Sequence, residues 1–313
     1  MTLTSPTQPP PAYAPPQRRV ALVIGSGSVK CAAALGLWRV LQREGIGLDL
    51  IVGCSGGSLY AATTALGFTA EHTSDLSARL FTREATGQRD RAALLRAAFP
   101  RLLGFSERFG LRSDRRVVAG IREAFGERTF ADATVPLYIT ATDFHTGEQV
   151  VLSRGSVAEA VRASIAIPFA FAPHEVDGRL LIDGFMSDPL PVGVAIKEGA
   201  NVIVAMGFES PYQTRVTSVG RFAFQMSSIM TNNLLRASFA FHGLAHHGEV
   251  IPVIPRFGER IRLFDTAKIP YIIDEGERAM EEQMPYLRRL LAASPAPAAS
   301  PAPVAPAAPA AAV

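Results

Sequence analysis

Two apolar runs near the N-terminus, separated by a stretch with helical spacing, limit the folds open to this chain. Residues 19–24 are R-V-A-L-V-I and residues 48–52 are L-D-L-I-V, while the segment between them is rich in alanine and leucine. A continuous β-branched run is typical of a strand buried on both faces, as in parallel sheets. The order strand, helix, strand has the length of a right-handed crossover. The sequence therefore predicts an α/β fold.

Later segments continue this alternation. Strand-like runs occur at 136–142, 148–152, 179–182 and 201–206, and a helix is expected at 156–166. Strands alternating with helices predict a three-layer α/β/α arrangement around a central, mostly parallel sheet. In such sheets, functional groups gather beyond the carboxyl ends of the strands.

Composition sets the expected limits of the folded part. The chain has 313 residues, 48% of them hydrophobic, and many of its 23 prolines fall near the two ends. We expect a disordered Pro-rich segment at 1–18, one folded domain at 19–292 and a disordered Ala/Pro-rich tail at 293–313. The prolines argue against a signal peptide or a membrane-spanning helix at either end. With only two cysteines, a cytoplasmic location is expected, with peripheral membrane contact as a further option.

Positive charge is concentrated in one segment. Residues 79–122 hold eleven arginines against four acidic residues, although the formal net charge of the whole chain is only +3. Leucine and phenylalanine are interleaved with these arginines, which predicts a basic helical cover over a cleft or a surface that meets anionic lipid. A solvated helical face is the simpler interpretation. Nucleic acid is not expected as a partner, because no recognised binding motif accompanies the charge.

A glycine-rich turn follows the second apolar run. Residues 53–57 are G-C-S-G-G, and the helix-like stretch S-L-Y-A-A-T-T-A-L comes directly after them. This matches G-x-S-x-G, the strand-to-helix turn that exposes a nucleophilic serine hydroxyl. The strand before it and the helix after it are the context that the motif requires, so Ser55 is the candidate nucleophile. A helix-capping role is the alternative for this serine.

A second glycine-rich loop, G-S-G-S at 25–28, follows the first strand and precedes a helix. Free N–H groups at the start of a helix favour negative charge, which makes this loop a candidate oxyanion hole. Dinucleotide binding is the competing interpretation. It lacks support because Lys30 stands where the third glycine belongs, and no ribose-binding acid ends the next strand.

A nucleophilic serine needs a base, and the six histidines include none whose sequence setting marks it as a partner of Ser55. Asp183 follows the strand-like run R-L-L-I and precedes a glycine. In a desolvated cleft the pKa of a carboxyl group rises, so Asp183 could accept the serine proton. An ordinary Asp-Gly turn is the alternative. Asp143 is expected to brace a hairpin.

Residues 222–248 form an amphipathic, methionine-containing stretch with helical spacing. Most such stripes belong to the core. Part of a channel for long apolar chains is the alternative for this helix.

Several blocks, taken together and in order, resemble the patatin-like phospholipase family over most of residues 18–210. They are V-I-G-S-G-S-V-K-C-A-A-A-L-G, G-C-S-G-G-S, A-T-D-F-H-T-G-E-Q-V-V-L-S-R-G, A-S-I-A-I-P-F-A-F-A-P and L-I-D-G-F-M-S-D-P-L-P-V. Each block is weak alone, and their combination in this order is specific.

The resemblance implies a three-layer α/β fold and hydrolysis of acyl esters of phospholipids or related lipids, through an acyl-enzyme intermediate and without metal or cofactor. An acyl-lipid substrate and peripheral contact with an anionic membrane are the expected partners. The implied residues are Ser55 as nucleophile, Asp183 as base, the main-chain N–H groups at Ser26, Gly27, Ser28 and Gly56 as oxyanion hole, and Lys30 in substrate binding.

This sequence departs from the family pattern in the first loop. Ser26 and Ser28 stand where glycines are usual, and Cys31 stands where the last glycine of the block is usual. A side chain at these positions favours negative φ, so the departures affect the oxyanion geometry. A catalytically weak family member that binds lipid is therefore the alternative function.

Overall fold

The computed structural model describes residues 18–292 except positions 83, 85–87, 89, 211, 245–247 and 264. The segment predicted to be a disordered tail, 293–313, lies outside the described residues, as does all of 1–18 except Arg18. The predicted domain limits therefore stay predictions.

Within the described residues, eight strands form one sheet in the order β5-β6-β3-β2-β1-β7-β8, with β4 beside β3. Strands β3, β2, β1, β7 and β8 are parallel to one another, while β4 and β6 pair antiparallel with β3, and β5 pairs antiparallel with β6. The predicted mostly parallel sheet is confirmed. The strands are β1 Val20–Ile24, β2 Leu50–Cys54, β3 Leu137–Asp143, β4 Gln149–Leu152, β5 His174–Val176, β6 Arg179–Asp183, β7 Val202–Met206 and β8 Glu249–Val253.

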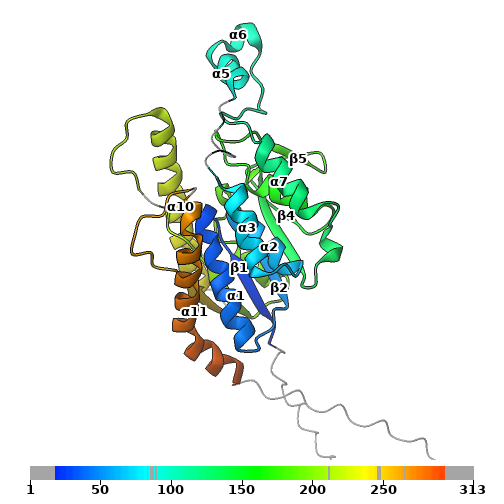
Figure 1. Cartoon of the computed structure of the whole chain (residues 1–313), viewed down its shortest axis with the longest axis vertical. Helices are drawn as coiled ribbons and strands as arrows, with labels where there is room; N and C mark the ends of the chain where they lie inside the picture. The colour runs from blue at the N-terminus through cyan, green and yellow to red at the C-terminus, as the bar shows by residue number, and fades with distance from the viewer. Residues whose placement is uncertain are drawn as a thin grey trace, which may run out of the picture.

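Helices cover both faces of the sheet, which gives the predicted three layers (Figure 1). One face packs against α1, α2, α8 and α11, and the other against α9 and α10. The α-helices are α1 Ala33–Arg43, α2 Gly56–Ala65, α3 Ala70–Leu80, α5 Arg91–Ala98, α6 Pro100–Leu103, α7 Arg115–Phe125, α8 Val157–Ser164, α9 Val192–Lys197, α10 Val219–Leu244 and α11 Ile269–Ala292. The short 3-10 helices are η1 Ser28–Ala32, η2 Phe130–Asp132, η3 Gly184–Met186 and η4 Thr266–Lys268.

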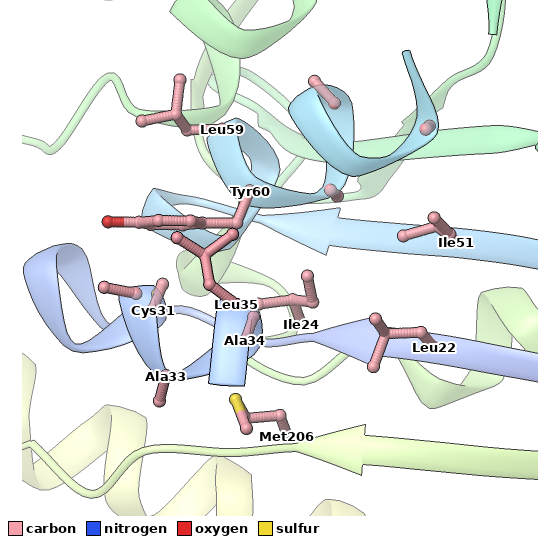
Figure 2. Packing of buried hydrophobic residues seen from close by; sticks show 14 of the residues in the cluster. Leu22, Ile24, Cys31, Ala33, Ala34, Leu35, Ile51, Leu59, Tyr60 and Met206 are labelled. Atoms are coloured by element: carbon pink, nitrogen blue, oxygen red, sulfur yellow. The ribbon is translucent and has the colours of Figure 1, made fainter. Parts of the chain in front are cut away.

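The alternation of side chains along the central strands explains why their sequences are continuously apolar. In β1, Leu22 and Ile24 point to the face covered by α1 and α2, while Ala21 and Val23 point to the face covered by α9. Both faces exclude water, so every position of the strand is apolar. Figure 2 shows Leu22 and Ile24 with Tyr60 of α2 on the first face.

Helices α1 and α11 lie side by side with their backbones in contact (Figure 1). A Cβ atom at Gly36 would lie 2.0 Å from the carbonyl oxygen of Ile273, and one at Gly276 would lie 2.0 Å from the carbonyl oxygen of Ala33. Only glycine permits so close an approach. The last helix is thereby joined to the first βαβ unit.

The segment predicted as a basic helical cover contains α5, α6 and the start of α7, and α5 and α6 project beyond the rest of the fold (Figure 1). We call residues 90–110 the cap. Among its residues only Ala93 and Gly110 are buried. No helix in the described part of the chain is both long and apolar enough to cross a membrane.

The helix predicted within 222–248 is observed as α10, and positions 245–247 lie outside the described residues. The expected core contact occurs around Leu235, which is buried against the second face of the sheet with Phe239. Phe222, Met226 and Met230 are exposed instead. The core interpretation therefore applies to only part of this helix.

Candidate active site

Ser55 lies in a strained turn between β2 and α2. Its backbone has φ 55° and ψ −129°, a left-handed conformation that residues with a Cβ rarely adopt. The neighbouring glycines permit the turn, because a Cβ at Gly57 would lie 2.4 Å from the carbonyl oxygen of Ile24 and one at Gly53 would lie 2.7 Å from Cα of Ser58. The G-C-S-G-G sequence thus forms the turn that its pattern predicts.

The order of the strands brings Asp183 to this serine from 128 residues away. Cys54 at the end of β2 is paired with Thr140 of β3, and Ala141 of β3 is paired with Asp183 at the end of β6. The hydroxyl of Ser55 donates a hydrogen bond of 2.7 Å to Oδ2 of Asp183. Gly184 then lets the chain turn away, since a Cβ there would lie 2.5 Å from the carbonyl oxygen of Thr140.

The carboxyl group of Asp183 is completely buried. Burial raises its pKa to about 7, although the hydrogen bonds from the Ser55 hydroxyl and the Phe185 N–H act in the opposite direction. The nearby thiols of Cys31 and Cys54 are buried and free, and burial raises the pKa of each well above its usual value. Both cysteines are small, buried residues. Because the pKa of Asp183 is about 7, its carboxyl group can take up or release a proton close to neutral pH.

Ser164, at the end of α8, holds the main chain of the turn. Its Oγ accepts a hydrogen bond of 2.8 Å from the N–H of Ser55 and donates one of 2.7 Å to the carbonyl oxygen of Thr140. Sequence reasoning missed this role. The available signal was the block A-S-I-A-I-P, which contains this serine and entered the sequence analysis only as part of the family resemblance.

The loop after β1 lies against the serine turn. Of the three amide donors predicted in this loop, those of Ser26, Gly27 and Ser28, two have free N–H groups. Among the described residues, the N–H groups of Gly27, Ser28 and Gly56 have no hydrogen-bond acceptor. The N–H of Ser26 donates to the carbonyl oxygen of Pro189 at 2.8 Å. The expectation that Ser26 contributes to an oxyanion hole is therefore wrong, because its amide is already used.

The two serines of this loop differ in backbone conformation. Ser28 has φ 53°, a conformation that favours glycine, and glycine is the usual residue at this position of the family. The expectation that a serine here would take a negative φ is therefore wrong. The conformation costs about 1 kcal/mol for a residue with a Cβ. The Ser28 hydroxyl donates to the carbonyl oxygen of Leu263, which holds the loop in place. Gly27 stays glycine because a Cβ there would lie 2.6 Å from the ring of Phe208.

Lys30, predicted to bind substrate, points elsewhere. Its Nζ donates a hydrogen bond of 2.7 Å to the carbonyl oxygen of Glu209 and lies 5.8 Å from the centre of the Phe257 ring. Burial lowers the pKa of this amine. These contacts hold Lys30 against neighbouring segments of the chain, and its side chain does not line the pocket beside Ser55.

A small apolar pocket opens beside the serine hydroxyl. Ser28, Ser55 and Gly56 form one wall, and the other lining residues are apolar. Helix α10 contributes no residue to it, so the acyl-channel alternative for that helix finds no support there. The apolar lining residues are Phe81, Val117, Ile165, Ile167 and Phe171.

Asp143 braces a hairpin, as expected. Its Oδ1 accepts hydrogen bonds from the N–H groups of His145 and Thr146, and its Oδ2 accepts one of 2.8 Å from Arg179. The bond from the Arg179 guanidinium is the main reason that the pKa of Asp143 falls to about 2. This carboxylate has no contact with Ser55.

The sequence profile of the patatin-like phospholipase family matches residues 22–196, more than half of the chain. The chain therefore belongs to the patatin-like phospholipase family. Membership supports lipid hydrolysis in general terms.

Relatives among curated proteins agree with this family. An uncharacterized NTE family protein of Mycobacterium tuberculosis is 32% identical over 191 residues, which are 60% of this chain and 48% of that protein. Neuropathy target esterase sws of Drosophila melanogaster is 27% identical over 204 residues, 64% of this chain and 14% of that protein. The chain thus spans about half the length of the mycobacterial relative and much less of the fly protein.

Among solved structures, VipD from Legionella pneumophila gives a TM-score of 0.47 at 15% identity, covering 86% of this chain and 67% of VipD. The type III effector ExoU gives 0.42 at 15% identity, covering 87% of this chain and 54% of ExoU.

Proposed function

We propose that the chain is a serine acyl hydrolase that cleaves acyl ester bonds of phospholipids or related lipids, with Ser55 as nucleophile and Asp183 as base. The hydrogen bond of 2.7 Å between the Ser55 hydroxyl and a fully buried carboxylate carries this proposal. Family membership supports it, as does the esterase in the name of the fly relative.

In the acylation step, Oγ of Ser55 attacks the ester carbonyl carbon while Asp183 takes the hydroxyl proton. A carboxylate with a pKa of about 7 is a much stronger base than an exposed one and is still largely ionised at slightly alkaline pH. The carbonyl oxygen becomes an oxyanion, which the free N–H groups of Gly27, Ser28 and Gly56 stabilise. Collapse of this intermediate breaks the ester bond, and the alcohol leaves with the proton from Asp183.

In the deacylation step, Asp183 takes a proton from water, whose oxygen attacks the acyl carbon on Ser55. A second oxyanion forms at the same three N–H groups. Its collapse breaks the bond to Oγ, and Asp183 returns the proton to Ser55 as the fatty acid leaves. One carboxyl group thus serves as base and acid in turn, without a histidine.

The pocket beside Ser55 suits the apolar part of such a substrate. Phe81, Val117 and Phe171 present aromatic and aliphatic surface to the space next to the hydroxyl. With a volume of about 20 Å³, the pocket has room only for the part of an acyl chain next to the ester, whose carbonyl would face the loop that contains Gly27.

The test combines covalent labelling with product release. We expect a fluorophosphonate probe to label wild-type protein at Ser55, identified by mass spectrometry of peptides, and to leave Ser55→Ala unlabelled. Asp183→Asn should be labelled at least a hundredfold more slowly, because the loss of a general base typically costs about 10²–10⁴ in rate. Asp143→Asn makes the same chemical change at a carboxylate away from the serine and should label like wild type.

Fatty-acid release from phospholipid vesicles and cleavage of a soluble short-chain nitrophenyl ester should follow the same order of variants. Circular dichroism establishes that each variant is folded. If folded wild-type protein is neither labelled nor active on either substrate, hydrolysis by this dyad is refuted, and the lipid-binding alternative takes its place.

A further inference from the structure

The cap, residues 90–110, exposes an unusual amount of apolar surface for so small an element. Leu102 is 82% exposed, and Phe99 and Phe105 are each 57% exposed. Figure 1 shows that α5 and α6 project beyond the rest of the fold. Several large exposed apolar side chains within one small element indicate a site of contact with a membrane or another molecule. The exposed apolar residues of the cap are Leu94, Leu95, Phe99, Leu102, Leu103 and Phe105.

Arginines accompany these apolar residues. Arg91, Arg96 and Arg101 are exposed, and none forms an ion pair with an acidic residue in the described part of the chain. Arg108 differs, because it is paired with Glu175. Exposed leucine and phenylalanine among unpaired arginines are the composition of elements that lie in the interface of an anionic bilayer.

We propose that the cap docks on a bilayer that contains anionic phospholipid, with its leucine and phenylalanine side chains in the interfacial region and its arginines on the lipid phosphates. Docking goes beyond the proposed hydrolysis, because it requires neither Ser55 nor Asp183.

The cap is connected at both ends to the pocket beside Ser55. The chain leaves that pocket at Phe81, just after α3, and returns to it at Val117 in α7. Just after the cap, the N–H of Leu111 donates a hydrogen bond of 2.9 Å to the carbonyl oxygen of Phe169, in the loop after α8. Phe169 is exposed, and Phe171 two residues later lines the pocket. A docked cap therefore places the pocket close to the lipid surface.

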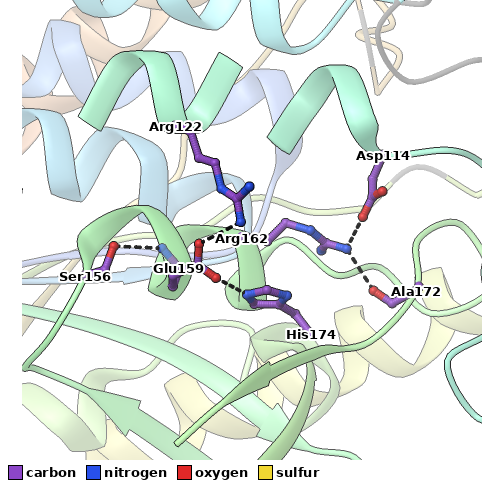
Figure 3. Close-up of polar contacts among 7 residues, drawn as sticks. All are labelled: Asp114, Arg122, Ser156, Glu159, Arg162, Ala172 and His174. Carbon is purple, nitrogen blue, oxygen red and sulfur yellow. Dashed lines mark hydrogen bonds and ion pairs between the residues drawn. The ribbon is translucent and has the colours of Figure 1, made fainter. Parts of the chain in front are cut away.

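A buried arginine fixes the base of the cap. Arg162 of α8 pairs with Asp114, at the start of α7, and donates a hydrogen bond of 2.9 Å to the carbonyl oxygen of Ala172 (Figure 3). These contacts join the returning end of the cap to the helix that also carries Ser164.

The exposed arginines of the cap favour a bilayer over a second copy of the chain as the partner that covers its apolar surface. A symmetric contact between two caps would place Arg96 and Arg101 of one copy near the same residues of the other. Like charges in contact destabilise such a pairing. An anionic surface instead neutralises these arginines, and each contributes about a fivefold gain in binding.

The test measures binding of the full chain to vesicles by sedimentation, on the Ser55→Ala background so that no lipid is consumed. Vesicles of phosphatidylcholine are compared with vesicles in which about a third of the lipid is phosphatidylglycerol. We expect stronger binding to the anionic vesicles. The charge variant, Arg96→Gln with Arg101→Gln, should bind these roughly 30-fold more weakly. The apolar variant, Phe99→Ser with Leu102→Ser, should bind at least about tenfold more weakly.

Matched controls make the same changes away from the cap. Arg39→Gln with Arg289→Gln removes two exposed arginines on α1 and α11, and Val151→Ser removes an exposed apolar side chain on β4. Both should bind like the parent. A Leu102→Trp variant should show a blue-shifted emission on anionic vesicles only, since the chain has one other tryptophan, Trp38 of α1.

Equal vesicle binding by cap variants and parent would overturn docking, as would equal losses in the controls. A cap variant that changes the oligomeric state in sedimentation velocity without changing vesicle binding would assign the surface to a second copy. Cleavage of the soluble ester, measured with Ser55 intact, separates the two proposals. Docking with no cleavage refutes the hydrolase alone, and cleavage without docking refutes this inference alone.

Discussion

Replacing Asp183 by asparagine should stabilise the protein at neutral pH while it removes the proposed base. The folded-state pKa of Asp183 is about 7, against an ordinary value of 3.8. Between these two values the folded state holds a proton that the unfolded state has released. The wild type therefore loses stability as pH rises from about 4 to about 7, by about 1.4 kcal/mol per pH unit.

The structure sets the size of this effect. A difference of about three pH units corresponds to about 4 kcal/mol between pH 4 and pH 8. Asparagine cannot ionise, and it can still accept the hydrogen bond from the N–H of Phe185 while its amide donates to Ser55. The free energy of unfolding of Asp183→Asn minus that of wild type should therefore increase by about 4 kcal/mol across this range.

Urea unfolding of both proteins, followed by circular dichroism at a series of pH values, measures the difference directly. Other titrating groups are common to both chains and cancel, including the buried carboxyl of Asp188, whose pKa burial also raises. A difference that stays constant with pH would refute the reasoning, because it would mean that Asp183 titrates alike in the folded and unfolded states.

Three further outcomes are expected. For wild type on a soluble ester, kcat/KM should fall about tenfold per pH unit below pH 7, and a profile flat to pH 5 would exclude Asp183 as the base. Ser164→Ala leaves the Ser55 N–H without its acceptor and the Thr140 carbonyl without one donor, so unfolding experiments should show a loss of about 1–3 kcal/mol, and kcat should fall more than KM changes. Gly36→Ala should cost about 2–4 kcal/mol in thermal or urea unfolding, since its Cβ meets the backbone of α11, whereas Gly193→Ala has open space and should not destabilise.

The parts of the fold that depend on local sequence could be predicted. The continuous apolar run of β1 indicated a strand covered on both faces, and G-C-S-G-G indicated the turn that holds Ser55. Asp183 was recognisable because its strand ends in Asp-Gly, and Gly184 is needed where the chain passes Thr140. In each case the residue types are fixed by sterics or burial within a few positions of the chain.

The parts of the structure that depend on contacts between distant segments could not be predicted from the sequence. Nothing in the sequence around Ser26 shows that its N–H is taken by Pro189, or that Nζ of Lys30 reaches Glu209. The role of Ser164 arises because the end of α8 meets the start of α2, and a serine at the end of a helix gives no sign of that. The exposure of Phe222 on α10 was likewise hidden, since an amphipathic pattern does not say how far a helix extends beyond its sheet.

The contact between α1 and α11 has a consequence for the order in which this protein can mature on the ribosome. The first βαβ unit, with the loop and turn that surround Ser55, is synthesised within the first 65 residues, but the face of α1 around Gly36 packs against residues near Ile273. The hydroxyl of Ser28 likewise lacks its hydrogen-bond acceptor until Leu263 has been synthesised. A nascent chain therefore carries its serine turn incomplete, with apolar helix surface open, until nearly all of the folded part has emerged. Any hydrolytic activity of this site would begin only at that late point in synthesis.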